Sequence, residues 1–314
     1  MNLSVFVRNL KNPRIIFIIV ALLVSLLLPT FSPRYIVQTF ITVALYVALV
    51  GAWNILSGFT GYLFLGVSAF YGIGAYVYAI MSPLMPYYVT ILVAGAICFV
   101  IAFLIGMPFL KIRGPYFTIA SYALVLLFGN IILYYEQVVT RTTGRWISME
   151  HLSTIYTTLV IVCFFTFLVA YLIKRSKLGY GLFCIRGNED VANVIGINTF
   201  RYKCLAFGIC AFFIGLISAA ITPRSGYIDT TIVFATQIAF TTLVMGVFGG
   251  LGSLRGGLLS AFLISLLLEL FATRGDPYPF LIGLGILLFI IIYFVPKGLE
   301  SVMERVEKRL KKSA

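Results

Sequence analysis

Long runs of apolar residues, separated by short polar or glycine-rich stretches, recur along the whole chain. Most of them are long enough to cross about 30 Å of hydrocarbon as a helix that rises about 1.5 Å per residue. The pattern predicts ten membrane-spanning helices, at residues 15–28, 36–56, 62–81, 88–110, 116–135, 152–173, 204–221, 232–248, 256–271 and 280–295. We therefore expect an all-α polytopic membrane protein whose residues 1–314 form a single transmembrane domain.

Two of these ten runs are less regular than the others. Four glycines interrupt residues 62–81 or directly precede them, and residues 232–248 carry three threonines and a glutamine before a second glycine-rich stretch. Either run is compatible with a broken or re-entrant helix, because irregular backbone at membrane depth occurs where protein or water covers it. The expected number of spans is therefore eight to ten.

The composition excludes a water-soluble globular domain. Hydrophobic side chains make up 61% of the 314 residues and charged side chains only 11%, and the mean hydropathy is +1.06. The hydrocarbon core of a membrane is the solvent that such a composition fits. The first apolar run has a basic flank like that of a signal peptide, yet it has no cleavage site, and we expect it to remain as a helix.

Positive charges predict the orientation of the chain. With ten spans and a cytoplasmic amino terminus, eighteen of the 23 Lys and Arg residues fall inside, including the basic tail at residues 297–314. The five that fall outside are Arg34, Arg141, Arg145, Arg224 and Arg274. This bias follows the positive-inside rule and predicts that both termini are cytoplasmic. Topology and anionic lipid headgroups account for the net charge of +13, so no nucleic-acid partner is expected.

Signs of enzyme chemistry are scarce in the sequence. The chain has one histidine, His151, at a predicted outer helix end, and it has no phosphate-binding loop or nucleophile motif. Its five cysteines form no CxxC pair, and most lie in or beside apolar helices, where a thiol behaves as a small hydrophobe. We expect no catalytic site, no metal and no cofactor, and any ATP hydrolysis must come from another subunit.

One polar segment, at residues 174–203, is predicted to be a structured cytoplasmic loop. Asn188, Glu189 and Asp190 open a short amphipathic stretch, DVANVIGI, that ends at Gly196. Acidic residues suit the start of a helix and glycine suits its end. A short helix on the cytoplasmic face is what a rigid contact with a partner protein requires, although composition alone also fits an ordinary solvated loop.

The stretch IRGNEDVANVIGINTFRYKCLAF, at residues 185–207, resembles the cytoplasmic loop of LivM-type permease subunits of branched-chain amino acid ABC importers. Val191 and Gly187 depart from that pattern. The resemblance implies the ABC importer permease fold and a loop that docks on a separate ATPase subunit. It assigns this contact to Arg186, Asn188, Glu189, Asp190 and Gly196.

The same resemblance implies the partners and the location of the chain. A LivM-type subunit pairs with a second homologous permease and two ABC ATPase subunits, and it accepts substrate from an extracytoplasmic binding protein. It lies in the plasma membrane of a bacterium or archaeon. The expected substrates are leucine, isoleucine and valine, or a related small polar compound.

Two glycine-rich segments, residues 54–76 and 246–257, also resemble the family's signatures. The candidate residues of a translocation path there are Asn54, Gly58, Gly61, Gly66, Gly249 and Gly252. The alternative is tight helix packing without a ligand contact. The glycine spacing in the two segments is similar, which fits either an internal repeat or chance. Tyr62, Phe64 and Val67 stand where the family often has polar residues, and this bears on the identity of the substrate.

Glu269 is the one carboxylate within a predicted apolar run. Burial of a charge in hydrocarbon is costly, so such a residue is a functional candidate. It supports an alternative function, an ion-coupled secondary transporter. Its place near the outer helix end also fits a side chain that reaches the interface or pairs with Arg274.

Overall fold

The computed structural model describes residues 29, 33–272, 282, 283, 285, 299 and 300. The predicted spans at 15–28 and 280–295 and the basic tail at 297–314 lie wholly or largely outside these residues. Within them the protein is an all-α bundle, and seven helical segments are long and apolar enough to cross a membrane. These segments are Arg34–Gly58, Tyr87–Phe109, Pro115–Thr140, Leu152–Lys174, Thr199–Arg224, Thr230–Gly249 and Leu254–Phe271.

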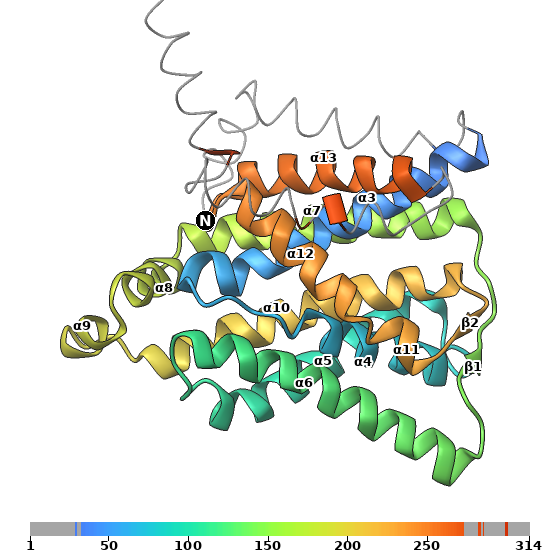
Figure 1. Ribbon diagram of the computed structural model, residues 1–314, viewed down its shortest axis with the longest axis horizontal. Coiled ribbons are helices and arrows are strands. Elements are labelled where there is room, and N and C mark those ends of the chain that lie inside the picture. Colours follow the sequence, from blue (N-terminus) through green and yellow to red (C-terminus); the bar gives the residue numbers. More distant parts are fainter. Residues whose placement is uncertain (1–28, 30–32, 273–281, 284, 286–298, 301–314) are drawn as a thin grey trace, which may run out of the picture.

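The helices run back and forth between two ends of the molecule (Figure 1). They are α3 (Arg34–Trp53), α4 (Val67–Met81), α5 (Tyr87–Phe109), α6 (Pro115–Tyr135), α7 (Leu152–Lys174), α8 (Lys177–Gly187), α9 (Glu189–Val194), α10 (Thr199–Ile221), α11 (Thr230–Val233), α12 (Thr236–Gly249) and α13 (Leu254–Ala272). Single π-helical turns, Asn54–Gly58 and Glu136–Thr140, extend α3 and α6. At one end, β1 (Arg145–Trp146) pairs antiparallel with β2 (Tyr227–Ile228), with Arg145 opposite Ile228. The structure thus confirms an all-α polytopic membrane protein.

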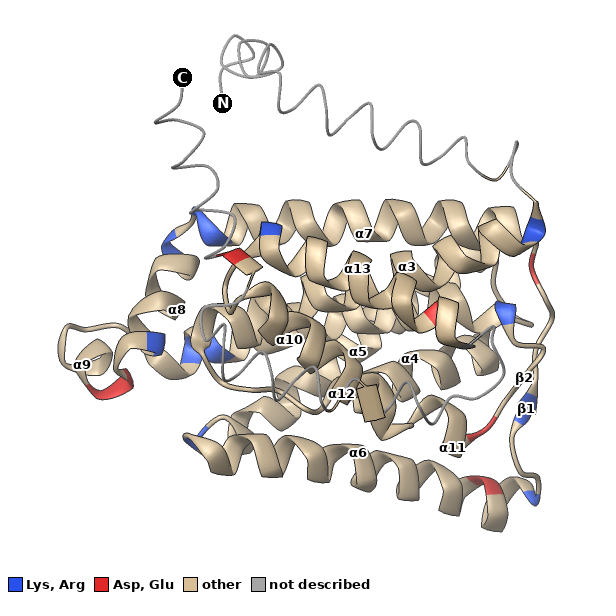
Figure 2. Cartoon of the chain, turned by 45° about the horizontal axis from the view of Figure 1, so that its top comes forward, with Lys and Arg blue, Asp and Glu red and all other residues tan. Residues whose placement is uncertain are grey.

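Charged residues gather at the two ends of the bundle, and few lie between them (Figure 2). The end that carries α8 and α9 holds Lys111, Arg113, Lys174, Arg175, Lys177, Arg186, Arg201, Lys203 and Arg255, which lie in connections or helix termini there. The β1–β2 end holds Arg34, Arg141, Arg145 and Arg224. The two ends separate the residues that the sequence predicts to lie inside from those predicted outside, and the α8–α9 end is the predicted cytoplasmic one.

Helix α10 lies at the centre and packs against α3, α4, α5 and α7. Lipid tails are as apolar as leucine, so helices in a membrane associate through close packing rather than through escape from water. Small residues allow that approach here: a Cβ added at Gly74 of α4 would lie 2.8 Å from the carbonyl oxygen of Gly215 in α10. Elsewhere between α4 and α10, the rings of Phe64, Phe70 and Phe207 pack together.

Both irregular apolar runs prove to be broken helices. The predicted helix at 62–81 begins only at Val67, after a non-helical stretch, and its 15 residues rise about 22 Å. This is less than the thickness of the hydrocarbon core. The predicted helix at 232–248 is interrupted at Phe234 and Ala235, between α11 and α12.

Side chains satisfy the backbone of the first break, residues 61–66. The Trp53 indole N–H donates to the carbonyl of Phe64 at 2.9 Å, and the Phe64 N–H donates to the Ser57 hydroxyl at 3.1 Å. The Leu65 N–H donates to the Ser121 hydroxyl at 2.9 Å. Without water at this depth, each of these groups would otherwise cost several kcal/mol.

One serine from α4 satisfies backbone polar groups at the second break. The Ser68 hydroxyl donates to the carbonyl of Ala235 at 2.7 Å and accepts from the N–H of Ala239 at 3.1 Å. Ala239 lies in the first turn of α12, where backbone N–H groups lack partners within their own helix. Ser68 therefore caps a helix that follows it by more than 160 residues in the chain.

Replacing Ser68 by alanine is expected to lower the free energy of unfolding by about 1–3 kcal/mol, because it leaves the buried Ala239 N–H without a partner. Thermal unfolding of the purified protein in detergent measures this change. Ser153→Ala, at an exposed serine in the first turn of α7, is the matched control and is expected to change stability little. Equal stability of the two variants would contradict the role given to Ser68.

Candidate functional site

The predicted cytoplasmic loop at 174–203 is mostly helical. It comprises α8, which the sequence analysis did not predict, the short helix α9 and the first turn of α10. The Asn188 side chain begins α9 by accepting hydrogen bonds from the N–H groups of Asp190 and Val191, at 2.9 and 3.2 Å. Gly196 follows the end of α9 with φ of +89°, a conformation that favours glycine. The loop is therefore a fixed structure rather than an irregular one.

The Glu189 carboxylate attaches α9 to three other parts of the molecule. It lies 2.6 Å from the Lys203 ammonium of α10 and accepts a short hydrogen bond from the Tyr62 hydroxyl of the first break. The Arg113 guanidinium, from the connection between α5 and α6, is 3.8 Å away. The side chains of Glu189 and Lys203 are only 10% and 4% exposed. Lys203 also donates to the carbonyl of Leu110 at 2.9 Å, so this nearly buried charge has several partners.

The surroundings of Glu189 also set its protonation. Burial raises the pKa of the carboxyl, but hydrogen bonds from Lys203 and Tyr62 and the positive charges of Lys203 and Arg113 outweigh that effect. The pKa of Glu189 is therefore lower than that of an ordinary glutamate. The carboxylate is ionised at neutral pH and holds its partners as a charged group.

Asp190 and Arg113 form an ion pair at 2.6 Å, on the surface of the loop. Both side chains are exposed, so water and salt weaken the attraction. This pair contributes less to anchoring the loop than the nearly buried contact of Glu189.

Arg186 connects the loop to both glycine-rich segments. Its guanidinium donates to the carbonyls of Gly58 and Leu251, at 3.1 and 3.2 Å. A Cβ added at Gly61 or Gly252 would lie 2.9 Å from the Arg186 side chain, so the two glycines make room for it. Both also have positive φ, +78° and +74°. Lys174 adds a bond from its ammonium to the carbonyl of Gly252 at 3.1 Å.

The remaining candidate path residues lie in close packing contacts. An added Cβ at Gly249 would lie 2.5 Å from the N–H nitrogen of Gly257 in α13, and one at Gly66 would lie 2.5 Å from the Phe64 ring. Asn54 is fully buried in the π-helical turn, and its amide has no hydrogen-bond partner among the described residues. The glycine contacts are those of closely packed helices, and the translocation path stays a prediction for these residues.

Three departures from the family pattern also have a structural explanation. Phe64 and Val67 are fully buried in the core, and Tyr62 bonds Glu189. Tyr62 is partly buried. Their apolar or aromatic character therefore serves packing and anchoring.

An exposed apolar patch on α9 was not singled out from the sequence. Val191, Val194 and Ile195 are 56%, 87% and 63% exposed, and together they define the α9 apolar patch. Their spacing of three and four residues places them on one face of the helix, and this spacing was visible in the sequence. Exposed apolar residues that cluster in this way mark contact surfaces.

The structure also changes the picture of membrane carboxylates. Glu269 is only partly buried, three residues before the end of α13, and Arg274 lies outside the described residues. Glu136, which the sequence analysis did not select, is 1% exposed. It accepts hydrogen bonds from the Tyr76 hydroxyl at 3.1 Å and the Gly144 N–H at 3.2 Å, and Arg145 is 3.8 Å away. Glu136 thus ties α4 and β1 to the end of α6.

Comparison with known proteins places this arrangement in a family. A family model described as "Branched-chain amino acid transport system / permease component" matches residues 35–295. The permease protein LivM of the high-affinity branched-chain amino acid transport system of Escherichia coli is 24% identical, with 95% of this chain and 77% of that protein aligned. BraD, the corresponding permease protein of Pseudomonas aeruginosa, is 29% identical over 45% of this chain and 46% of BraD.

A solved structure of PsaBC from Streptococcus pneumoniae in complex with Fab aligns with 85% of this chain and 94% of that chain, at 14% identity and a TM-score of 0.46. This score is too low to indicate a shared fold. The family model, in contrast, covers most of the chain, from α3 to beyond α13. The chain therefore belongs to the family of branched-chain amino acid transport system permease components and is a multi-pass membrane protein.

Proposed function

We propose that this chain is a transmembrane permease subunit of an ABC importer for leucine, isoleucine and valine, or for a related small polar compound. It would pair with a second homologous permease, work with two ABC ATPase subunits, and receive substrate from an extracytoplasmic binding protein. Membership of the permease family and the names of the relatives support this proposal. The plasma membrane of a bacterium or archaeon is the proposed location.

The single observation that carries this proposal is the α9 apolar patch on a firmly anchored loop. Val194 and its two neighbours face away from the bundle, whereas Glu189 and Arg186 bind inward to it. An element that transmits a movement needs both properties. Its outer face must bind the partner, and its inner face must be held rigidly by its own subunit. We assign the α9 apolar patch to the ATPase contact and Glu189 and Arg186 to anchoring.

The inward contacts give the loop a route to both broken helices. Glu189 bonds Tyr62 in the first break, and Arg186 bonds the carbonyls of Gly58 and Leu251 in the two glycine-rich segments. When ATP brings the ATPase subunits together, displacement of α9 would move these segments with it. A partner shifts such an equilibrium only if it binds one of the two states more tightly, so the patch must make different contacts in each.

Purification of the tagged chain in mild detergent from its native membrane tests the proposal. We expect a second permease and ATPase subunits as stoichiometric companions, identified by mass spectrometry, and uptake of labelled leucine, isoleucine or valine by the reconstituted complex. A folded chain recovered reproducibly alone would contradict the importer assignment. Uptake of another solute by the same complex would contradict only the substrate assignment.

Val194→Glu is expected to remove the ATPase subunits from that complex while the second permease remains, because it places a charge in the apolar contact. At least about a tenfold loss of ATPase recovery is expected, since an unpaired charge in an interface costs more than 1.4 kcal/mol. Leu84→Glu is the matched control, because Leu84 is 75% exposed in the turn after α4, at the opposite end. Normal ATPase recovery with Val194→Glu would assign the docking surface elsewhere.

Glu189→Gln is expected to destabilise the protein by about 3 kcal/mol at neutral pH, because it leaves the nearly buried Lys203 without its charge partner. The lowered pKa of Glu189 makes this difference dependent on pH. The stabilisation is present above the ordinary glutamate pKa of about 4.3 and is lost as pH falls through the lower pKa of the folded state. Thermal unfolding of both proteins between about pH 3 and pH 7 measures it.

A double variant separates anchoring from direct ATPase contact. Glu189→Gln with Lys203→Met removes both charges and is expected to recover most of the lost stability, since replacing a buried pair is far less costly than breaking it. If Glu189 itself contacts the ATPase, the double variant is expected to bind the ATPase less tightly and also to lose the coupling of ATP hydrolysis to transport. If Glu189 only anchors the loop, the double variant is expected to bind the ATPase normally, and only its transport-coupled ATP hydrolysis is expected to fall.

A further inference from the structure

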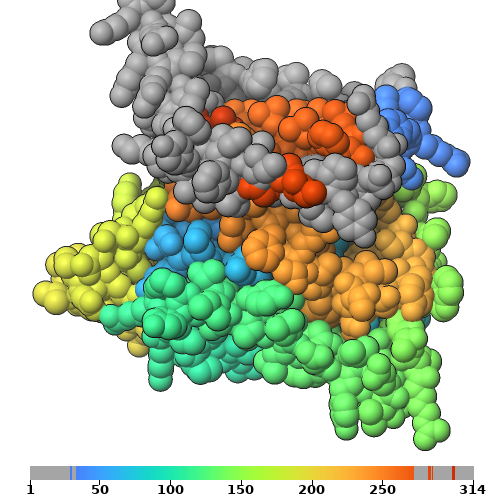
Figure 3. Space-filling view, viewed as in Figure 1, coloured from blue at the N-terminus to red at the C-terminus, as the bar shows by residue number. Residues whose placement is uncertain are grey.

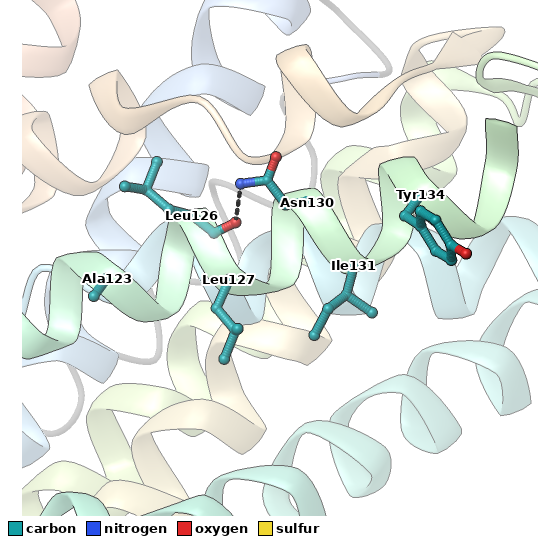
Figure 4. Close-up of a pocket in the computed structure, with 6 residues that line it drawn as sticks. All are labelled: Ala123, Leu126, Leu127, Asn130, Ile131 and Tyr134. Carbon is teal, nitrogen blue, oxygen red and sulfur yellow. Dashed lines mark hydrogen bonds between the residues drawn. The ribbon is translucent and has the colours of Figure 1, made fainter. Parts of the chain in front are cut away.

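The described membrane-spanning segments contain two asparagines, and only one of them has its amide paired. Asn130 of α6 is exposed beside a shallow groove of about 470 Å³, and its amide N–H donates to the Leu126 carbonyl at 2.8 Å (Figure 4). Asn54 is fully buried, and within the described part of the chain neither its amide oxygen nor its amide nitrogen has a hydrogen-bond partner. Burial of an unpaired amide costs free energy, so this amide destabilises the arrangement that the structure describes.

The Asn54 amide lies where α3 meets α13. Asn54 opens the π-helical turn at the end of α3, and single turns of this kind are frequent at functional sites. A Cβ added at Gly58 would lie 2.2 Å from the amide oxygen, and one added at Gly257 of α13 would lie 2.7 Å from the amide nitrogen. The two glycines therefore make room for the amide. An apolar side chain could fill the same space without the cost of an unpaired amide, so packing alone does not account for the asparagine.

An unpaired backbone donor lies beside this amide. The backbone nitrogen of Gly252, in the turn between α12 and α13, would lie 2.9 Å from the same added Cβ of Gly58. Gly252 is buried, and among the described residues its N–H donates no hydrogen bond. A buried acceptor, the Asn54 amide oxygen, and a buried donor, the Gly252 N–H, thus lie next to the same glycine without bonding each other. A small displacement of the turn relative to α3 would bring them within hydrogen-bonding distance.

The carbonyls of the same region are, in contrast, occupied by the predicted cytoplasmic loop. Arg186 of α8 donates to the carbonyls of Gly58 and Leu251, and Lys174 at the end of α7 donates to the carbonyl of Gly252. Figure 3 shows the segment that joins α3 to α4, in blue, between the loop, in yellow, and the α12–α13 segment, in orange. Cationic side chains thus hold the acceptors of this turn, while the neighbouring amide stays unpaired. Movement of the loop away from the turn would make these carbonyls available to the amide N–H groups.

We propose that Asn54 is a switching residue, whose amide is paired in only one of two arrangements of this region. In the arrangement that the structure describes, Arg186 and Lys174 hold the turn and the amide is unpaired. In the other arrangement the loop has moved, and the amide oxygen accepts from the Gly252 N–H. The amide nitrogen then donates to a carbonyl of the turn that Arg186 or Lys174 has released. The unpaired amide raises the free energy of the first arrangement, and its new bonds lower that of the second.

Such an exchange brings the two arrangements close enough in free energy for a partner to shift the population between them. A ligand moves a two-state equilibrium only by the difference between its affinities for the two states. The smaller the free energy difference between the states, the less differential binding the ATPase has to supply. The role in transport therefore rests on the proposed function, whereas the unpaired amide is a property of this chain alone.

Thermal unfolding of the purified full-length chain in detergent tests the exchange. The effect of Asn54→Ala on the unfolding midpoint is measured in the unaltered chain and in an Arg186→Met background, which frees the carbonyls of Gly58 and Leu251. We expect Asn54→Ala to lower the midpoint by at least about 2 °C more in the second background, because only there does the substitution remove a paired amide. The cost of the smaller side chain is present in both backgrounds and cancels in the comparison.

Ser260→Ala is the matched control. Ser260 of α13 is also buried, but its hydroxyl donates to the Met245 carbonyl of α12 at 2.6 Å. This substitution is expected to lower the midpoint by the same amount in both backgrounds. Equal effects of Asn54→Ala in the two backgrounds would overturn the inference, because they would show that the pairing of the amide does not depend on Arg186. An ordered water that pairs the amide in both backgrounds would give this result.

Uptake by the reconstituted complex tests the consequence for transport. Asn54→Ala is expected to reduce ATP-driven uptake at least about tenfold while the ATPase subunits stay bound, because the second arrangement loses its hydrogen bonds. Uptake at the level of the unaltered complex would overturn the switching role. A complex that never forms from the unaltered chain counts against the proposed function. The stability comparison needs no partner, so the two failures are distinguishable.

Discussion

The fold depends on one constraint, that every backbone polar group inside the hydrocarbon needs a hydrogen-bond partner within the protein. Continuous helices meet it by themselves, but two segments of this chain do not. Ser57, Ser121 and Trp53 satisfy the first break, and Ser68 satisfies the second. Four side chains thus permit backbone irregularity at a depth where water would otherwise be required.

Ser68 links the two breaks to each other, and Arg186 links the predicted cytoplasmic loop to both glycine-rich segments. Ser68 is the second residue of the helix that follows the first break, and it caps the helix that follows the second. At the α8–α9 end, Arg186 binds the carbonyls of Gly58 and Leu251, one in each glycine-rich segment. Arg186 thus joins α8 to both glycine-rich segments at once, through contacts between residues more than 60 positions apart in the chain.

The sequence predicted what depends on local pattern and missed what depends on contacts between distant segments. Apolar length identified the spans, and the order of Asn188, the acidic residues and Gly196 identified α9 and its ends. The glycines marked residues 62–81 as a broken or re-entrant helix, but the start of α4 at Val67 could not be predicted, because the partners of residues 61–66 lie on other helices. The bond between Tyr62 and Glu189 spans 127 residues, so the sequence could not show that Glu189 is bonded within its own subunit.

The distribution of charge and apolar surface on the loop fits what the proposed coupling element would have to do. A charged pair that is almost buried holds its two residues together, because separating them leaves each charge poorly solvated and without its partner. An apolar surface forms and releases contacts without leaving unpaired charges behind. The loop therefore keeps Glu189 and Arg186 toward its own subunit and Val191, Val194 and Ile195 toward the outside. With charged residues outside and apolar residues inside, partner binding would require desolvation of charged side chains. The loop would also be held less rigidly by its own subunit.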